Sequence, residues 1–452
     1  MSAALKPYPE YRDSGVDWLP KVPAHWDFVR NGRLLAERNE TGFPELPILE
    51  VSLRTGVRVR DMEGGRKQQM ADRAKYKRAA EGDIAYNIMR MWQGAVGIAP
   101  CDGLISPAYV VARPLDNVEP RFYTYLFRTT AYMHEVSFAS RGIVPDRNRL
   151  YWQYFKPMLS PSPPPEEQRR IADFLDAYTA QVHRLIAAKR RTITALIERK
   201  QAILSELLRC GMDEAATVVG DLPWIDQRPG NWRVNRLKPF VGNITELGSV
   251  AEPSNSIITL DRVESWSGRV LDASPTTSET FTGKVFQPED VLFGKLRPYL
   301  AKVTRTTEAG LAGTEFLVLR AKPAAFRPRF LEELLRSKPF IEFVAAHSVG
   351  AKMPRTEWEA IASIPVAIPS LAEQDRLCDH FTAVSGDLNE AIAKERSQID
   401  LILEYRDSLI ASVVTGQLDV REAAVRVVEG DGLAEETATD EEDMEDALDA
   451  VD

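Results

Sequence analysis

An internal repeat constrains the fold of this chain more than any other feature. Its most distinctive part is a Trp-Pro-Trp signature that recurs at a spacing of 206 residues: Trp18, Pro23 and Trp26, then Trp224, Pro229 and Trp232. More matched positions follow at spacings of 206 to 208: Asp83 and Asp290, Arg90 and Arg297, Gly103 and Gly310, Pro120 and Pro328, Glu167 and Glu373. Self-similarity at one long period indicates that the 452 residues are a tandem duplication followed by a short remainder.

Each copy begins with a mixed pattern of strands and helices. Residues 46–59, 82–91 and 103–112 form short β-branched and aromatic stretches broken by Gly and Pro, which is typical of strands. Residues 121–140 and their counterparts 329–348 have helical spacing and follow a proline. We therefore expect an α+β fold, with one globular domain at 1–162 and a second at 212–369.

A long amphipathic helix is predicted to follow each domain, at 163–211 and at 370–416. Apolar residues recur there every three or four positions. The boundaries match helix chemistry: Pro165 suits a first turn, and Ser370 with Glu373 forms a capping box. The predicted stops are Gly211 and Gly416.

The length of these helices predicts how they pack. About 44 residues at ~1.5 Å each give a rod of about 66 Å, too long for a small domain to cover. We therefore expect the two helices to form an antiparallel coiled coil that separates the domains. A chain built in this way has an internal pseudo-two-fold repeat and resembles a dimer.

The net charge divides unevenly along the chain. The formal charge is −9, yet residues 429–452 contain twelve acidic residues and no basic one, so the remainder carries 57 − 54 = +3. We expect 417–428 to return to the domains and 429–452 to be a disordered acidic tail. The tail either keeps the protein soluble or mimics DNA and competes for a basic groove.

Other sequence features exclude several classes of protein. The three Cys form no pair or C-x-x-C motif, the N-terminus has no signal-peptide pattern, and no apolar run approaches 18 residues. We therefore expect a cytoplasmic protein that does not enter a membrane. No phosphate-binding loop, dinucleotide fingerprint, zinc-protease motif or nucleophile elbow is present, and the five His have no metal-ligand spacing. The sequence thus predicts no catalytic residue, no metal and no cofactor bound by this chain.

Matched basic positions are the best candidates for binding. Arg90 and Arg297 each follow a strand and stand two residues before an aromatic, an arrangement suited to phosphates and bases. Alternatively, each is a solvated arginine packed on its aromatic neighbour. The loops 140–149 and 348–355 contain Gly, Pro and several cations, although they could equally be ordinary polar connectors. The candidate DNA-binding residues are Arg90, Arg141, Arg147, Arg149, Lys295, Arg297, Lys352 and Arg355.

Four segments resemble a known family. They are YPEYRDSGVDWLPKVPAHW at 8–26, PPPEEQRRIADFLD at 163–176, LAEQDRLCDHF at 371–381 and VTGQLDVR at 414–421. Together they resemble the specificity subunit (HsdS family) of type I restriction-modification systems, over nearly the whole chain up to about residue 425. The first copy departs from the pattern by ending in RCGMDEA, and the acidic tail has no counterpart in the family.

The resemblance implies a non-catalytic DNA-recognition subunit. Each domain would be a target recognition domain that reads one half of a bipartite DNA sequence. The helices would set the spacing and dock two methyltransferase subunits that carry S-adenosylmethionine, and restriction subunits would join them. Candidate partner-binding residues at the helix starts are Glu167, Gln168, Glu373 and Gln374. Two rivals remain: a nuclease or methyltransferase with a hidden site, and an adaptor that does not bind DNA.

Overall fold

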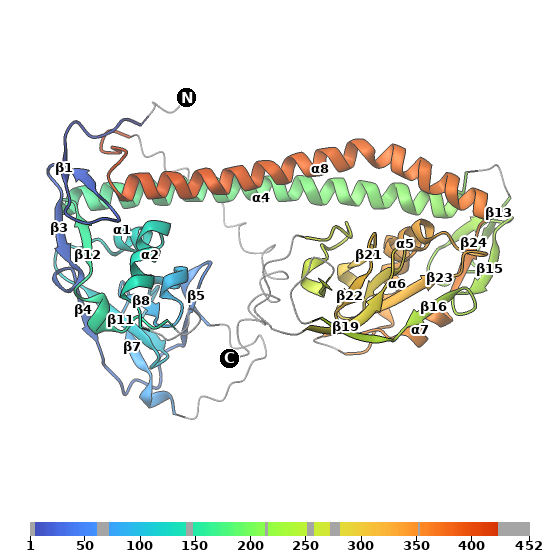
Figure 1. Ribbon diagram of the computed structural model, residues 1–452, viewed down its shortest axis with the longest axis horizontal. Helices are drawn as coiled ribbons and strands as arrows, with labels where there is room; N and C mark the ends of the chain where they lie inside the picture. Colours follow the sequence, from blue (N-terminus) through green and yellow to red (C-terminus); the bar gives the residue numbers. More distant parts are fainter. Residues whose placement is uncertain are drawn as a thin grey trace. The chain divides into compact units, whose positions relative to one another are not determined.

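The computed structural model divides into two compact units, which are described separately (Figure 1). Unit 1 comprises residues 1–188 and 398–452, and unit 2 comprises residues 189–397. The structure describes residues 5–60, 72–141, 148–212, 216–250, 257–271, 281–350 and 353–423. The acidic segment 429–452, Arg147 and Lys352 lie outside the described residues.

A four-stranded antiparallel sheet forms the centre of unit 1. Its strands, in spatial order, are β4 (Leu35–Arg38), β11 (Tyr109–Pro114), β8 (Ile84–Asn87) and β9 (Val96–Ile98). Helices α1 (Pro120–Phe127) and α2 (Thr130–Ala139) lie beside this sheet in Figure 1. Pro120 at the start of α1 has the backbone angle that a first helical turn needs.

Both faces of this sheet are buried, because alternate residues of a strand point to opposite sides. Tyr86 and Val110 face a core that contains the aromatic residues of α1. Ala85 and Val111, one position along, face a second core made with the small strands. This explains why the sequence of β8 is apolar at successive positions rather than at every second one.

Smaller elements complete unit 1. The paired strands are β1 (Tyr11–Asp13) with β2 (Lys21–Pro23), β3 (Asp27–Arg30) with β12 (Leu159–Ser162), β5 (Leu49–Ser52) with β6 (Gly56–Val59), and β7 (Lys77–Ala79) with β10 (Gly103–Ile105). Short helices are η1 (Asn31–Arg33), η2 (Arg73–Lys75), η3 (Met91–Gln93) and α3 (Trp152–Phe155).

Unit 2 repeats the central sheet of unit 1, while its smaller strands join into a larger second sheet. Its central sheet has the order β16 (Val241–Ile244), β23 (Phe316–Ala321), β20 (Val291–Gly294), β21 (Val303–Arg305). A second sheet has the order β17 (Leu247–Val250), β19 (Phe281–Phe286), β22 (Gly310–Ala312), β18 (Ile257–Ile258). The remaining strand pairs are β13 (Thr217–Val219) with β14 (Gln227–Pro229) and β15 (Arg233–Arg236) with β24 (Pro365–Ile368). Its helices are α5 (Pro328–Arg336), α6 (Lys338–Ala346), α7 (Trp358–Ser363), η5 (Leu260–Arg262) and η6 (Pro298–Leu300).

The similarity between the two units extends to individual backbone pairings. Ile48 forms a parallel bridge with Leu104 in unit 1, and Ile257 pairs in parallel with Leu311 in unit 2. The predicted α+β fold with an internal repeat is therefore confirmed.

Two long helices run through both units. They are α4 (Pro165–Cys210) and α8 (Leu371–Val414), whose ends lie within two residues of those predicted. Two glutamates occupy the first turn of α4, where the helix dipole favours negative charge. The Ser370 hydroxyl accepts a hydrogen bond from Glu373 N at 3.2 Å and caps α8. The other half of the predicted capping box is not formed, because Glu373 Oε1 accepts from Trp232 Nε1 instead.

The helices pack antiparallel in each unit. In unit 2, Lys189 Nζ lies 3.0 Å from Glu395 Oε2, and Lys200, further along α4, reaches back to Asn389 Oδ1 at 3.0 Å. In unit 1, Ile171 and Leu175 share a core with Leu409 and Val413. The predicted antiparallel coiled coil is confirmed.

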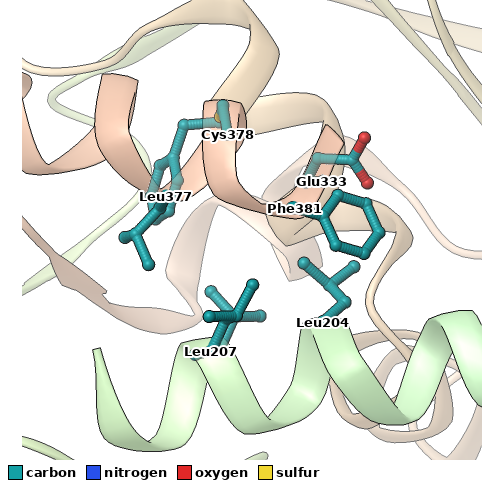
Figure 2. A pocket seen from close by; sticks show the side chains of 8 residues that line it. Leu204, Leu207, Glu333, Leu377, Cys378 and Phe381 are labelled. Atoms are coloured by element: carbon teal, nitrogen blue, oxygen red, sulfur yellow. The ribbon is translucent and has the colours of Figure 1, made fainter. Parts of the chain in front are cut away.

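Both helices also contribute to the domain cores. In unit 2, Leu204 of α4 and Leu377, Cys378 and Phe381 of α8 line a small apolar hollow with Glu333 of α5 (Figure 2). Its volume of about 10 Å³ would hold at most one water molecule. Burial raises the pKa of the Cys378 thiol to about 12. We interpret this hollow as core packing rather than as a ligand site.

The end of each long helix packs against the start of one copy of the repeat. Gly416, after α8, has a φ of +75°, and a Cβ built on it would lie 2.4 Å from Pro23 Cδ in unit 1. Gly211, after α4, has a φ of +66°, and its Cβ would lie 2.8 Å from Pro229 Cγ in unit 2. Only glycine fits both the left-handed backbone and this close approach.

We therefore expect Gly416→Ala to lower the free energy of unfolding by about 1 to 3 kcal/mol. Gly386→Ala is the matched control, because Gly386 lies inside α8 with nothing within 4 Å of a Cβ. Removing a helical glycine there should raise stability by about 0.5 to 1 kcal/mol. Urea denaturation measures both changes, and equal effects of the two substitutions would contradict this account of the joint.

Candidate nucleic-acid interface

The two candidate loops of each copy meet through one matched backbone hydrogen bond. In unit 1, Leu150 N donates to Ile88 O at 2.8 Å. In unit 2, Thr356 N donates to Lys295 O at 3.0 Å. These pairs occupy corresponding positions of the repeat. In each unit they join an earlier loop (88–95 between β8 and β9, or 295–302 between β20 and β21) to a later loop (140–149 after α2, or 348–355 after α6). We call these two loops of a unit its joined loops.

A second matched feature closes the base of the later loop. Arg141 and Arg149 exchange two backbone hydrogen bonds of 3.1 and 3.0 Å. Val349 and Arg355 do the same at 3.0 and 2.9 Å. The guanidinium groups of Arg149 and Arg355 therefore start from equivalent backbone positions at the edges of their loops.

Arg90 and Arg297 each begin a short 3-10 turn in the earlier loop. Arg297 N donates to Pro354 O at 2.8 Å, which ties the two loops of unit 2 together again. Arg297 and Ala301 flank η6, and both are in the left-handed region, with φ of 50° and 48°. Such backbone strain in non-glycine residues concentrates at functional sites.

Basic side chains lie next to aromatic rings in these loops. The Arg141 guanidinium lies over the Tyr154 ring, 5.3 Å from its centroid. Arg149 is exposed and makes no ion pair with any residue in the described part of the chain. Tyr299 is 38% exposed beside Arg297. The arrangement suits phosphate contacts together with stacking on bases.

Unit 2 adds two carboxylates that the sequence analysis did not single out. Arg355 Nη2 forms an ion pair with Glu315 Oε2, and Lys295 Nζ lies 3.7 Å from Glu357 Oε2. Arg355 Nε also lies 3.9 Å from Glu357 Oε1. The four charges cancel locally, so this surface differs electrostatically from its counterpart in unit 1.

A matched lysine pair was also missed. Lys77 Nζ donates to Tyr109 O at 3.0 Å, and Lys284 Nζ donates to Phe316 O at 2.7 Å. Burial lowers the pKa of both ammonium groups, and in Lys284 the nearby Lys295 lowers it further. Their spacing of 207, the same as that of Arg90 and Arg297, could have identified the pair from the sequence.

The structure thus brings most of the predicted basic residues together within their own units. Lys295, Arg297 and Arg355 belong to one pair of joined loops, and Arg90, Arg141 and Arg149 to the other. DNA contact by any of these residues stays a prediction.

The four candidate residues at the helix starts have contacts inside their own units. Glu167 Oε1 accepts hydrogen bonds from Trp26 Nε1 at 2.9 Å and from Tyr8 Oη at 2.7 Å. Glu373 Oε1 accepts the matched bond from Trp232 Nε1 at 2.9 Å. Each acid therefore holds the repeated Trp of its unit against a long helix.

The neighbouring glutamines make an equally matched pair of bonds. Gln168 Oε1 accepts from Glu119 N at 2.9 Å, and Gln374 Oε1 accepts from Arg327 N at 2.8 Å. All four side chains at the helix starts are buried. Their described contacts fix the helices to the domains, and partner binding by them stays a prediction.

Asp83 and Asp290 lie at the starts of matched strands, and each carboxylate closes a turn. Asp83 Oδ2 accepts from Ala80 N, and Asp290 Oδ2 accepts from Gln287 N, both at 2.8 Å. Each also pairs with an arginine of its central sheet: Arg38 Nε, on β4 two strands from β8, lies 2.6 Å from Asp83, and Arg320 Nη2, on β23 next to β20, lies 2.7 Å from Asp290. These carboxylates are structural anchors of the central sheets.

Neither a metal site nor a membrane-spanning helix is found among the described residues. No group of three or more His, Cys, Asp or Glu residues in the described part of the chain could hold a metal ion. Among the described helices, none is long and apolar enough to cross a membrane.

The chain is similar in sequence and in structure to proteins of type I restriction systems. No protein-family model matches it. It is 23% identical over 288 residues to the specificity subunit of the type I restriction enzyme EcoDI of Escherichia coli, covering 57% of this chain and 61% of that protein. The chain thus aligns with about three fifths of the length of this curated relative. The resemblance predicted from the sequence motifs is confirmed.

The chain is also similar to solved structures, and the first of them supports the fold. The first, from a study of complex assembly and conformational transition of the type I restriction-modification system, has a TM-score of 0.53 at 18% identity. The match covers 88% of this chain and 99% of that one. The HsdS subunit from Thermoanaerobacter tengcongensis is 17% identical, with a TM-score of 0.39, over 90% of this chain and 100% of that one.

Proposed function

We propose that this chain is the DNA sequence-recognition subunit of a type I restriction-modification complex. Each globular domain reads one half of a bipartite duplex target. The assignment follows the domain limits predicted from the sequence, with DNA-reading domains at 1–162 and 212–369 and spacer helices at 163–211 and 370–416. Residues 417–428 return to the first domain, and 429–452 form the acidic tail.

The observation that carries this proposal is the matched pair of joined loops. Two units with the same backbone connections present different side chains at the same place. Such a chain suits a target with two different half-sites, because one scaffold then supports two separate readings. The basic residues of the loops bind phosphates and set the register, and neighbouring side chains read base edges in the major groove.

The chain itself performs no bond chemistry in this scheme. Two methyltransferase subunits, which carry S-adenosylmethionine, dock on the paired helices and flip the target adenine. Because Glu167 and Glu373 are buried, a partner would meet the exposed residues of the same helical turns, such as Glu166 and Arg169. Restriction subunits that translocate DNA join this core.

Footprinting of the chain assembled with its methyltransferase tests the proposal. We expect two protected half-sites separated by a fixed unprotected gap, with affinity that falls steeply as salt rises. One contiguous protected segment would exclude split recognition. DNA cleavage or methylation by the isolated chain would favour the hidden-enzyme alternative, and failure to bind any duplex would favour the adaptor.

The substitution Arg297→Gly separates the roles of this residue in stability and in binding. Glycine would relieve the strain of φ 50° and raise the free energy of unfolding by about 1 kcal/mol. DNA affinity should nevertheless fall by about 1 to 3 kcal/mol, because a base or phosphate contact is lost. Denaturation and DNA titration of the complex measure the two effects.

Ala301→Gly is the matched control for this substitution. It relieves similar strain at φ 48° without removing a cation, so the affinity should not change. If Arg297→Gly also leaves the affinity unchanged, Arg297 is only a solvated arginine packed beside Tyr299.

A further inference from the structure

Comparison of matched positions in the two units distinguishes residues that serve the same function in both from residues that serve a function in only one. Both copies must approach a DNA backbone, but each must read different bases if the proposed function holds. Residues retained at matched positions of the joined loops therefore suit phosphates, which are the same in every sequence. Residues that differ in charge at matched positions are candidates for base reading.

Arg149 and Arg355 are basic in both copies and so belong to the residues retained at matched positions. Two matched positions near them differ in charge: Ala108 of the first copy corresponds to Glu315 of the second, and Tyr151 corresponds to Glu357. The strand pairings fix this alignment, because Tyr109 opposes Asn87 in unit 1 and Phe316 opposes Gly294 in unit 2, all 207 residues apart. Unit 2 thus carries two acids where unit 1 has none.

Glu315 is the better held of these two acids. Its backbone carbonyl accepts a hydrogen bond from Lys295 N at 2.8 Å, and its Oε2 is paired with Arg355. A side chain that reads bases has to be fixed in this way by its neighbours. Glu315 Oε1 makes no hydrogen bond within the described part of the chain, so one acceptor remains available.

Glu357 is held more loosely. Its contacts with Lys295 and Arg355 are 3.7 and 3.9 Å, and its side chain is 56% exposed, against 33% for Glu315. Ion pairs of this length and exposure contribute little. Glu357 therefore offers a control that carries the same charge beside the same arginine.

We propose that Glu315 determines part of the specificity of unit 2 by accepting a hydrogen bond from the exocyclic amine of a cytosine. The inference rests on the proposed function and adds a residue and a base to it. A carboxylate repels phosphates and can only accept hydrogen bonds, and the cytosine N4 amine is the matching donor in the major groove. Adenine fits less well, because its N7 needs a donor beside the acceptor.

Arg355 acts here as a positioning residue. Its Nη2 donates to Glu315 Oε2 and so fixes the carboxylate. The second oxygen, Oε1, is held in place by the same ion pair and stays available as an acceptor. The remaining donors of the guanidinium stay able to meet a phosphate, as those of Arg149 do in unit 1.

Selection of bound sequences from a random duplex pool tests the inference. The complete complex is prepared with the wild-type chain, with Glu315→Ala, which restores the residue found at position 108, and with Glu357→Ala. We expect a split motif with a cytosine in one half for the wild type. Glu315→Ala should lower the preference for that cytosine at least about fivefold and leave the other half-site unchanged. Retention of the remaining bases of the unit 2 half-site shows that this unit of the variant is folded.

Each result is decisive for one of the two proposals. Glu357→Ala should retain the wild-type motif. If Glu315→Ala retains it too, or if both variants lose the same base, the assignment of Glu315 is overturned while the proposed function stands. A wild-type complex that selects no split motif overturns the proposed function and this inference with it.

Discussion

Alanine at both Arg149 and Arg355 is expected to weaken DNA binding by the complex at least about 30-fold at roughly 0.15 M salt. Each lost phosphate contact removes about 0.9 from the slope of log K against log salt, which corresponds to about 5-fold in affinity at that ionic strength. In unit 2 the loss is larger, because Glu315 and Glu357 are left facing DNA with Lys295 alone. Titration over a range of salt concentrations measures both the affinity and the slope.

The single substitutions should differ in a way that the structure explains. Arg149→Ala should weaken binding to all sequences equally, whereas Arg355→Ala should also blur the half-site of unit 2. Arg113→Ala removes the same charge near the far end of β11 and serves as the control. A salt slope that is the same in the double variant as in the wild type would exclude phosphate contact by these arginines.

The largest effect on stability is expected at Asp83. Asp83→Ala should lower the free energy of unfolding by about 3 to 4 kcal/mol, because Arg38 loses its buried partner and keeps only Glu40, whose side chain is 43% exposed. The side chains of Asp83 and Arg38 are only 3% and 13% exposed. The substitution also removes the acceptor for Ala80 N.

The matched residue Asp290 gives an internal comparison. Asp290→Ala should cost less, about 2 to 3 kcal/mol, because the Arg320 side chain is 39% exposed and water can replace its partner. Asp83→Asn should fall between the wild type and Asp83→Ala, since the amide oxygen can still accept from Ala80 N. Urea denaturation ranks the variants, and a change below about 1 kcal/mol for Asp83→Ala would show that the pair is not an anchor.

The architecture could be predicted from the sequence because its signals are long or repeated. The spacing of apolar residues and the boundary residues Pro165, Ser370, Gly211 and Gly416 placed both long helices to within two residues. The recurrence of Trp26 and Trp232 identified the duplication before any strand was assigned. Helix periodicity and a repeat are local or additive patterns, so they survive without knowledge of tertiary contacts.

The candidate interface was only partly predictable. Basic residues could be listed from composition, but the backbone bonds that join Leu150 to Ile88 and Thr356 to Lys295 depend on tertiary packing. Pairing of Arg355 with Glu315, 40 residues apart, has no local signal at all. Glu167 and Gln168 mark the start of α4 in the sequence, yet only the structure shows that they are buried against Trp26 and Glu119.

The charge of the chain also has a clearer meaning in this account. Its −9 combines a body of +3 with a tail of −12. The structure places candidate basic residues in the joined loops of both units, and in unit 2 two carboxylates offset part of their charge. Affinity for DNA should therefore depend strongly on phosphate contacts made by the methyltransferase partners.

Mapping of methylated bases across the genome of cells that carry the complete complex tests the central claim most directly. The account predicts methylation within a single motif that has two different half-sites separated by a constant gap. A contiguous motif, or a gap that varies from site to site, would contradict two separate DNA-reading units held at a fixed spacing.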